Sequence, residues 1–170
     1  METKQPPNRP SGRPFHRAVT FGRFNLCHEG HLARIKEMGR LAVYVTIGLS
    51  DNPRNLPFAL RKEVIHLALK DSGIAYSITM ASNPFELFKA VKDLNNPHVV
   101  TVFGEDQIAL GLAAKRHYGW LDCHVERLTS STAIRSHLDL EEWDLLASLT
   151  VPGTIPHLIN LRKLELTKNA

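Results

Sequence analysis

Apolar residues follow two different spacings along the chain, and the alternation of these spacings predicts the order of its elements. Continuous runs of β-branched and aromatic residues have the length and composition of buried strands. Apolar residues three or four positions apart mark one face of a helix. Five strands are expected, at Arg17 to Phe21, Leu41 to Gly48, Tyr76 to Met80, His98 to Phe103 and Cys123 to Leu128.

Helical patterns separate these runs. Four helices are expected between the strands. The first carries Leu32, Ile35 and Met38 with Gly39 as its stop, and the second runs from about Ala59 to Lys70. The third is capped at Asn83-Pro84 and continues through Leu94, and the fourth is opened by Gly104-Glu105-Asp106 and continues to Tyr118. Three more are expected after the last strand, from Ser130 or Ser131 to Leu138, from Glu142 to Leu149 and from Pro156 to Leu166. Helices that join parallel strands cross over in the right-handed sense. The pattern therefore predicts one α/β domain, a doubly wound five-stranded parallel Rossmann-like sheet with C-terminal helices.

The beginning of the chain differs in composition from the rest. Residues 1–14 hold four of the ten prolines, together with polar and basic residues, which is typical of a disordered segment. Residues 1–17 carry four basic residues against one acidic residue. We expect a disordered basic tail over residues 1–15 and a single domain over residues 16–170.

Composition and charge narrow the class of protein. A chain of 170 residues with 43% hydrophobic residues can bury one substantial core. The net charge of +4 comes mainly from the tail, so the rest of the chain is nearly neutral and a nucleic-acid partner is not expected. Cys27 and Cys123 are too few for the disulfide framework of a small secreted domain. No apolar run approaches the roughly 20 residues of a membrane span. We expect a cytoplasmic protein without a membrane partner, and leave a homo-oligomer open.

The segment from Thr20 to Leu32 combines the features of an anion site. Glycines at Gly22 and Gly30 allow backbone to approach a ligand closely, and the free amides that open a helix bind anions. His28 and His31 are three residues apart and share one helix face. Imidazoles beside free amide donors suit a polyphosphate, although one histidine capping its own helix is the plain structural alternative.

Two motifs resemble those of a known family. Gly22-Arg23-Phe24-Asn25 followed by His28-Glu29-Gly30-His31 resembles the GxFxPxHxGH signature of the nucleotidyltransferase superfamily, with Leu26 at the position of the usual proline. Ser130-Ser131-Thr132-Ala133-Ile134-Arg135 is similar to the second signature of that superfamily, S-[SG]-T-x-I-R. The resemblance covers about Val19 to Leu138. It implies transfer of AMP from ATP to a phosphorylated acceptor with release of pyrophosphate.

The resemblance also implies roles for particular residues. His28, His31 and Arg135 would be catalytic. The residues that would bind the nucleotide are Gly22, Arg23, Phe24, Gly30, Gly104, Asp106, Ser130, Ser131 and Thr132. The residues themselves are compatible with these roles, because hydroxyls and amides in a first helical turn form a second anion site and a guanidinium one turn later can reach the same phosphates. Helix capping by Asp106 and a surface position for Arg135 remain the structural alternatives.

The acceptor is less well defined by the sequence. One set of residues most resembles the pattern of nicotinamide-mononucleotide adenylyltransferases: Arg23, Asn25 and the Pro57-Phe58 pair with Arg61. This resemblance implies that the products are NAD and pyrophosphate. A cytidylyltransferase, a phosphopantetheine adenylyltransferase and a nucleotide-sensing module without turnover are alternatives. Arg54 or Arg61 would hold the acceptor phosphate or lie at the surface, and Trp120 and Phe58 would stack on a base or fill the core.

A metal centre is the remaining possibility. Cys27, His28, His31, Cys123 and His124 are of types that bind zinc, but the chain lacks both H-E-x-x-H and C-x-x-C spacing. Adjacent residues on a strand point to opposite faces, so Cys123 and His124 would not share a ligand set. We expect no protein metal site. Mg²⁺ would be carried mainly by the phosphates of ATP.

Overall fold

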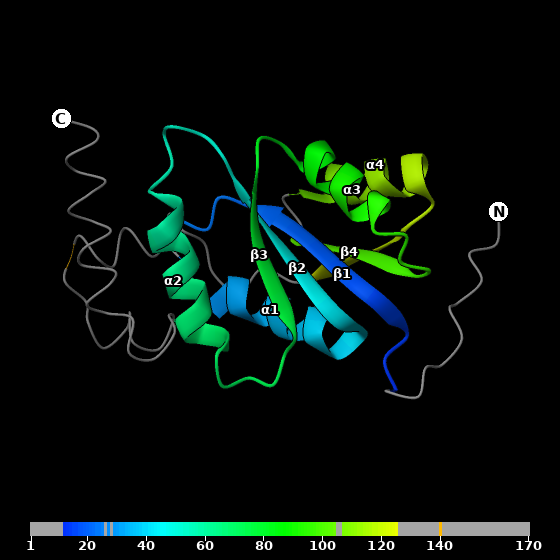
Figure 1. Cartoon of the computed structure of the whole chain (residues 1–170), viewed down its shortest axis with the longest axis horizontal. Helices are drawn as coiled ribbons and strands as arrows, with labels where there is room; N and C mark the ends of the chain where they lie inside the picture. The colour runs from blue at the N-terminus through cyan, green and yellow to red at the C-terminus, as the bar shows by residue number, and fades with distance from the viewer. Residues whose placement is uncertain (1–11, 26, 28, 105–106, 126–139, 141–170) are drawn as a thin grey trace.

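A computed structural model of the chain describes residues 12–25, 27, 29–104, 107–125 and 140, which are drawn in colour in Figure 1. Strands and helices alternate through the described residues, from the first strand to the fifth. The strands are β1 (Phe15–Gly22), β2 (Ala42–Ser50), β3 (Tyr76–Ala81), β4 (Val99–Gly104) and β5 (Leu121–Val125). The helices are α1 (Glu29–Leu41), α2 (Phe58–Leu69), α3 (Pro84–Asp93) and α4 (Ile108–Tyr118).

The strands form one sheet in the order β3-β2-β1-β4-β5, and every pair is parallel. This confirms the predicted doubly wound α/β sheet. The chain moves outward from β1 through β2 to β3 and then returns to place β4 on the other side of β1. The order therefore reverses between β1 and β4, and ligands of open α/β sheets bind at the carboxyl ends of strands at such a reversal.

Helices cover both faces of the sheet, as Figure 1 shows. On one face, α1 and α2 bury Ile35, Met38 and Ile65 against β1, β2 and β4. On the other face, α3 and α4 bury a second cluster that includes Phe88 and Phe103. Phe88 packs edge-on against Phe103 and against Trp120, which fixes α3 over β4 and the start of β5. The central strands β1, β2 and β4 are consequently buried on both sides, as their continuous apolar runs indicate, whereas the edge strands β3 and β5 are partly exposed.

Local sequence explains where α3 begins. The side chain of Asn83 accepts a hydrogen bond from the Glu86 backbone N–H at 2.9 Å, and Pro84 occupies the first turn. Both features were expected from the sequence, because an asparagine cap satisfies an amide that lacks an intrahelical partner and proline lacks that amide.

The structure corrects the predicted end of α1. Gly39 does not stop the helix, which continues to Leu41, and β2 begins directly at Ala42. A Cβ at Gly39 would lie 2.8 Å from the side chain of Ile74, so this glycine permits close packing inside the helix. β5 also begins two residues before the expected Cys123, because Leu121 already pairs with Val100 of β4.

The helices expected beyond residue 128 lie outside the described residues, as does most of the expected tail. Within the described part of the chain, no helix has the length and apolar composition needed to cross a membrane.

Candidate active site

The turn after β1 has a specific backbone shape. Phe24 adopts a left-handed conformation with φ of 51°, yet its side chain is only 3% exposed. The ring folds back over Gly22, where an added Cβ would lie 3.0 Å from the ring atom Cε2. A side chain at position 22 would push on this ring, so the glycine allows the ring to lie over the turn without a shift.

His31 lies in the first turn of α1 and meets the same ring. The imidazole of His31 and the ring of Phe24 have centroids 4.6 Å apart and planes tilted by 42°. His31 and the neighbouring Gly30 are half-buried, so both keep part of their surface open. Four of the residues named from the sequence, Gly22, Phe24, Gly30 and His31, therefore belong to one turn at the carboxyl end of the central strand.

The loop after β2 is attached to this turn by side chains. The buried Asn25 accepts a hydrogen bond from the Leu56 N–H at 3.1 Å through its Oδ1 atom. Arg61, in the first turn of α2, donates from Nε to the Leu56 carbonyl at 2.8 Å and from Nη1 to the Arg23 carbonyl at 2.9 Å. Arg61 is 2% exposed, and this burial lowers the pKa of its guanidinium. Arg61 was expected either to hold the acceptor phosphate or to lie at the surface. Neither expectation holds, because the side chain is buried and binds main-chain carbonyls.

A third segment reaches the turn from β4. Gly104 ends β4 and is buried, and Gln107 follows shortly afterwards. The Nε2 atom of Gln107 donates to the Phe21 carbonyl at 3.3 Å, and its Oε1 atom accepts from Nη1 of Arg34 at 3.5 Å. Gln107 thus spans the reversal of strand order between β1 and β4 and reaches α1. The sequence analysis named Gly104 and Asp106 as candidates but missed Gln107. The signal in the sequence that points to Gln107 is its position directly after Asp106.

Several of the named residues have side chains at the surface or on other parts of the fold. Arg23 and Arg54 are exposed, on the turn after β1 and the loop after β2. Phe58 is the first residue of α2 and packs, partly buried, against the core. Trp120 stacks on Tyr118 with centroids 4.7 Å apart and precedes β5, at the opposite end of the sheet from the turn. Trp120 therefore fills the core on the α3 and α4 side.

The whole second motif lies outside the described residues, as do two other named residues. The named residues concerned are Ser130, Ser131, Thr132 and Arg135 of that motif, together with His28 of the first motif and Asp106. Their roles stay predictions.

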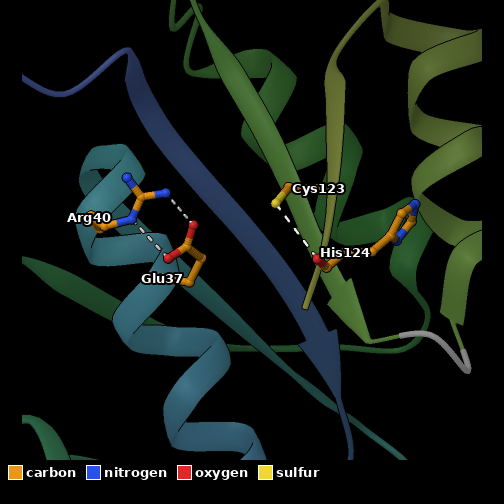
Figure 2. A network of polar contacts seen from close by, with 4 residues as sticks. All are labelled: Glu37, Arg40, Cys123 and His124. Atoms are coloured by element: carbon orange, nitrogen blue, oxygen red, sulfur yellow. Dashed lines mark hydrogen bonds and ion pairs between the residues drawn. The ribbon is translucent and has the colours of Figure 1, made fainter. Parts of the chain in front are cut away.

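The cysteine and histidine of β5 are oriented as a strand requires. Figure 2 shows the sulfur of Cys123 pointing toward α1, where Glu37 and Arg40 form an ion pair, while the ring of His124 points the other way. The Nε2 atom of His124 contacts Asp122 Oδ2 at 3.1 Å. No three histidine, cysteine, aspartate or glutamate side chains gather as a possible metal site among the described residues.

Comparisons with known proteins point to one fold. No protein-family model matches the sequence, and no curated protein matches it. A bifunctional NMN adenylyltransferase/ADP ribose pyrophosphatase from Francisella tularensis is similar in structure, with a TM-score of 0.61 and 22% identity over 75% of this chain and 43% of that chain. The same protein complexed with AMP and a Mn ion gives a TM-score of 0.62 and 17% identity over 91% of this chain and 53% of that chain. This chain thus spans about half of that bifunctional protein.

A third similar structure matches over its whole length. It is a protein from Vibrio parahaemolyticus assigned as a nicotinate-nucleotide adenylyltransferase, with a TM-score of 0.60 and 19% identity over 89% of this chain and 99% of that chain. Identities at this level show a shared fold. The chain therefore has the fold of these adenylyltransferases, consistent with the resemblance of its two motifs to the nucleotidyltransferase superfamily.

Proposed function

We propose that the protein is a nucleotidyltransferase of this superfamily that transfers AMP from ATP to nicotinamide mononucleotide. The observation that carries the proposal is the turn after β1, where Gly22, Phe24 and His31 form a compact unit at the carboxyl end of the central strand. This unit lies beside the reversal of strand order, the usual ligand position in such a sheet. The same residues carry the first motif, and the similar solved structures include adenylyltransferases.

The reaction requires charge stabilisation more than a nucleophile in the protein. A phosphate oxygen of the acceptor forms a bond to the α-phosphorus of ATP, and the bond from that phosphorus to the oxygen of the β-phosphate breaks. Pyrophosphate leaves with the electron pair. Negative charge builds on the non-bridging and leaving oxygens, so positioned donors accelerate the step.

The turn supplies such donors. His31, and His28 by its motif, would donate to the triphosphate. The first amides of α1, starting near Gly30, would bind a phosphate as helix N-termini commonly do. Arg135 and the hydroxyls of Ser130, Ser131 and Thr132 would bind the same phosphates from the second motif. Arg23 is exposed at the turn and can meet a charged substrate there.

Divalent metal enters this proposal as part of the substrate. The similar Francisella protein was solved with AMP and a Mn ion. The described residues of the present chain offer no group of three side chains that would hold a resident ion. In this proposal ATP enters the reaction as its Mg²⁺ complex, with the ion held mainly by the phosphates.

Product analysis with a panel of substrates tests the proposal. The purified chain is incubated with Mg²⁺, ATP and nicotinamide mononucleotide, and NAD and pyrophosphate are quantified. We expect the two products in equal amounts, and less product with nicotinate mononucleotide, phosphopantetheine or flavin mononucleotide.

Addition of CTP and phosphocholine to this panel tests the alternatives. Formation of a CDP-alcohol from CTP and phosphocholine, without NAD, would replace the proposed acceptor and nucleotide with those of a cytidylyltransferase. Binding of ATP without pyrophosphate release under any acceptor would indicate a nucleotide-sensing module.

A further inference from the structure

A buried arginine joins the two loops that border the proposed site. The Leu56 peptide is held on both of its polar groups, because Arg61 Nε donates to its carbonyl at 2.8 Å and Asn25 Oδ1 accepts from its N–H at 3.1 Å. The second nitrogen, Arg61 Nη1, donates to the Arg23 carbonyl at 2.9 Å. We call these three hydrogen bonds the inter-loop bracket. The bracket ties the turn after β1 to the loop after β2.

The bracket uses a group that is costly to bury. A guanidinium removed from water is destabilised unless it is paired, and at 2% exposure Arg61 has lost nearly all contact with solvent. Arg61 forms no ion pair with a carboxylate among the described residues. The charge of Asp51 acts on Arg61 only from the exposed start of the loop. An apolar side chain of similar volume would fill the same space without losing the hydration of a charged group. The burial of the Arg61 guanidinium therefore favours a role for its hydrogen bonds in addition to packing.

The loop that receives the bracket is itself ordered. The Asn52 side chain accepts from the Arg54 N–H at 2.9 Å, and Asn55 Nδ2 donates to the Ser50 carbonyl at 3.0 Å. The loop is therefore internally constrained between Ser50 and Pro57. The hydrogen bonds at Leu56 therefore connect an internally constrained loop to the turn.

The other end of the bracket lies next to the donors. Arg23 directly precedes Phe24, whose ring packs on His31. A displacement of the Arg23 carbonyl would move the ring and with it the imidazole. Arg61 thus reaches the candidate donor through two intermediate residues, without itself facing substrate.

We infer that Arg61 is a positioning residue that holds the turn after β1 and the loop after β2 in one preset arrangement for the transfer of AMP to the acceptor. This inference rests on the proposed function. Arg61 acts through the main chain, using the fork of its guanidinium to reach two carbonyls at once. Lysine carries the same charge but lacks this fork.

Kinetics of three variants at position 61 test the role. Arg61→Met keeps volume and removes the donors, Arg61→Lys keeps the charge, and Arg61→Ala leaves space for free guanidinium. We expect Arg61→Met to lower kcat by about 100-fold, the scale for a displacement of about 1 Å in an active site. The kcat of Arg61→Lys should lie between the kcat of Arg61→Met and that of the wild type.

Chemical rescue separates positioning from a general loss of stability. Guanidinium chloride at a concentration below the unfolding transition should restore kcat of Arg61→Ala by about 10-fold or more, if the added ion occupies the vacated fork and makes part of its charge-assisted bonds. The matched control is Arg40→Ala, an exposed arginine paired with Glu37 on α1, whose kcat should be unchanged and insensitive to guanidinium. Amide hydrogen exchange of Leu56 provides a second measurement, and exchange should be faster in Arg61→Met than in the wild type.

The outcomes distinguish this inference from the proposed function. If the wild type forms no product with any nucleotide and acceptor, the proposed function fails and the positioning role fails with it. If the wild type is active and Arg61→Met only melts at a lower temperature, with kcat unchanged in the folded protein, the proposed function stands and the positioning role is wrong. An Arg61→Ala variant of low kcat that guanidinium does not restore would also overturn the role.

Discussion

The ring of Phe24 packs directly on the imidazole of His31, with centroids 4.6 Å apart, although seven positions and the start of a helix separate the two residues. The contact depends on the left-handed backbone of Phe24, which turns its side chain back into the core. A buried hydrophobic residue consequently orients a half-buried histidine. The geometry of the turn and the chemistry of the histidine are therefore coupled.

Removal of the imidazole should affect turnover far more than folding. We expect His31→Ala to lower kcat for pyrophosphate release by about 100- to 1,000-fold, the scale for loss of one donor to the transition state. His117→Ala is the matched control, because His117 is exposed near the end of α4. Unchanged turnover in His31→Ala would remove this histidine from the mechanism.

A methyl group at position 22 should disturb the turn through the Phe24 ring. The added Cβ of Gly22→Ala would lie 3.0 Å from ring atom Cε2, so the ring must move and its contact with His31 must change. We expect kcat to fall by about 10-fold or more, because small displacements in an active site are expensive.

A second variant identifies the cause of that loss. Leucine at position 24 has no ring for the added methyl group at position 22 to meet. The double variant Gly22→Ala/Phe24→Leu should therefore lose no more activity than Phe24→Leu alone. Additive losses in pyrophosphate release would show that the methyl group acts by another route.

The thiol of Cys123 should resist alkylation at mildly alkaline pH. Burial raises the pKa of Cys123, and the nearby Glu37 carboxylate adds to this effect, while Arg40 opposes it (Figure 2). The thiolate is the reactive form, so iodoacetamide should modify Cys123 more slowly than a free cysteine at pH 8, as followed by mass spectrometry of the labelled peptide. A rate equal to that of a model thiol would contradict the prediction.

The same shift makes stability depend on pH. The folded state binds the proton of Cys123 more tightly than the unfolded state, so this contribution to stability is present below the pKa of the unfolded chain. It is lost as pH rises through the folded pKa. Cys123→Ala lacks this titration. Urea unfolding should therefore show a larger alkaline loss of stability in the wild type than in Cys123→Ala.

The cap of α3 offers a prediction about stability alone. Asn83→Ala removes the acceptor of the Glu86 N–H and should lower the free energy of unfolding by about 1 kcal/mol. Ser82→Ala, at the exposed preceding position, should change the free energy of unfolding by much less. Equal effects of the two variants in urea unfolding would show that the cap is not the cause.

Much of the fold could be predicted from local patterns. The apolar runs and the cap at Asn83 report local preferences, and these agree with the strands and with the start of α3. Gly39 shows where this reasoning fails. A glycine after a helical pattern usually ends a helix, but here Ile74, distant in sequence, packs against it within the helix. A contact between distant segments overrides the local preference, and only the tertiary structure shows such a contact.

The candidate site divides in the same way. The sequence by itself determined the order of strands and helices and the presence of histidine and glycine at the first turn, because spacing and residue type are properties of the chain. Only the tertiary structure decided that Arg61 is buried between two loops, that Gln107 spans β1 and β4, and that Phe24 orients His31. These relationships join residues that are distant in sequence, and their energies depend on burial and direction. Both arise only when the chain has folded.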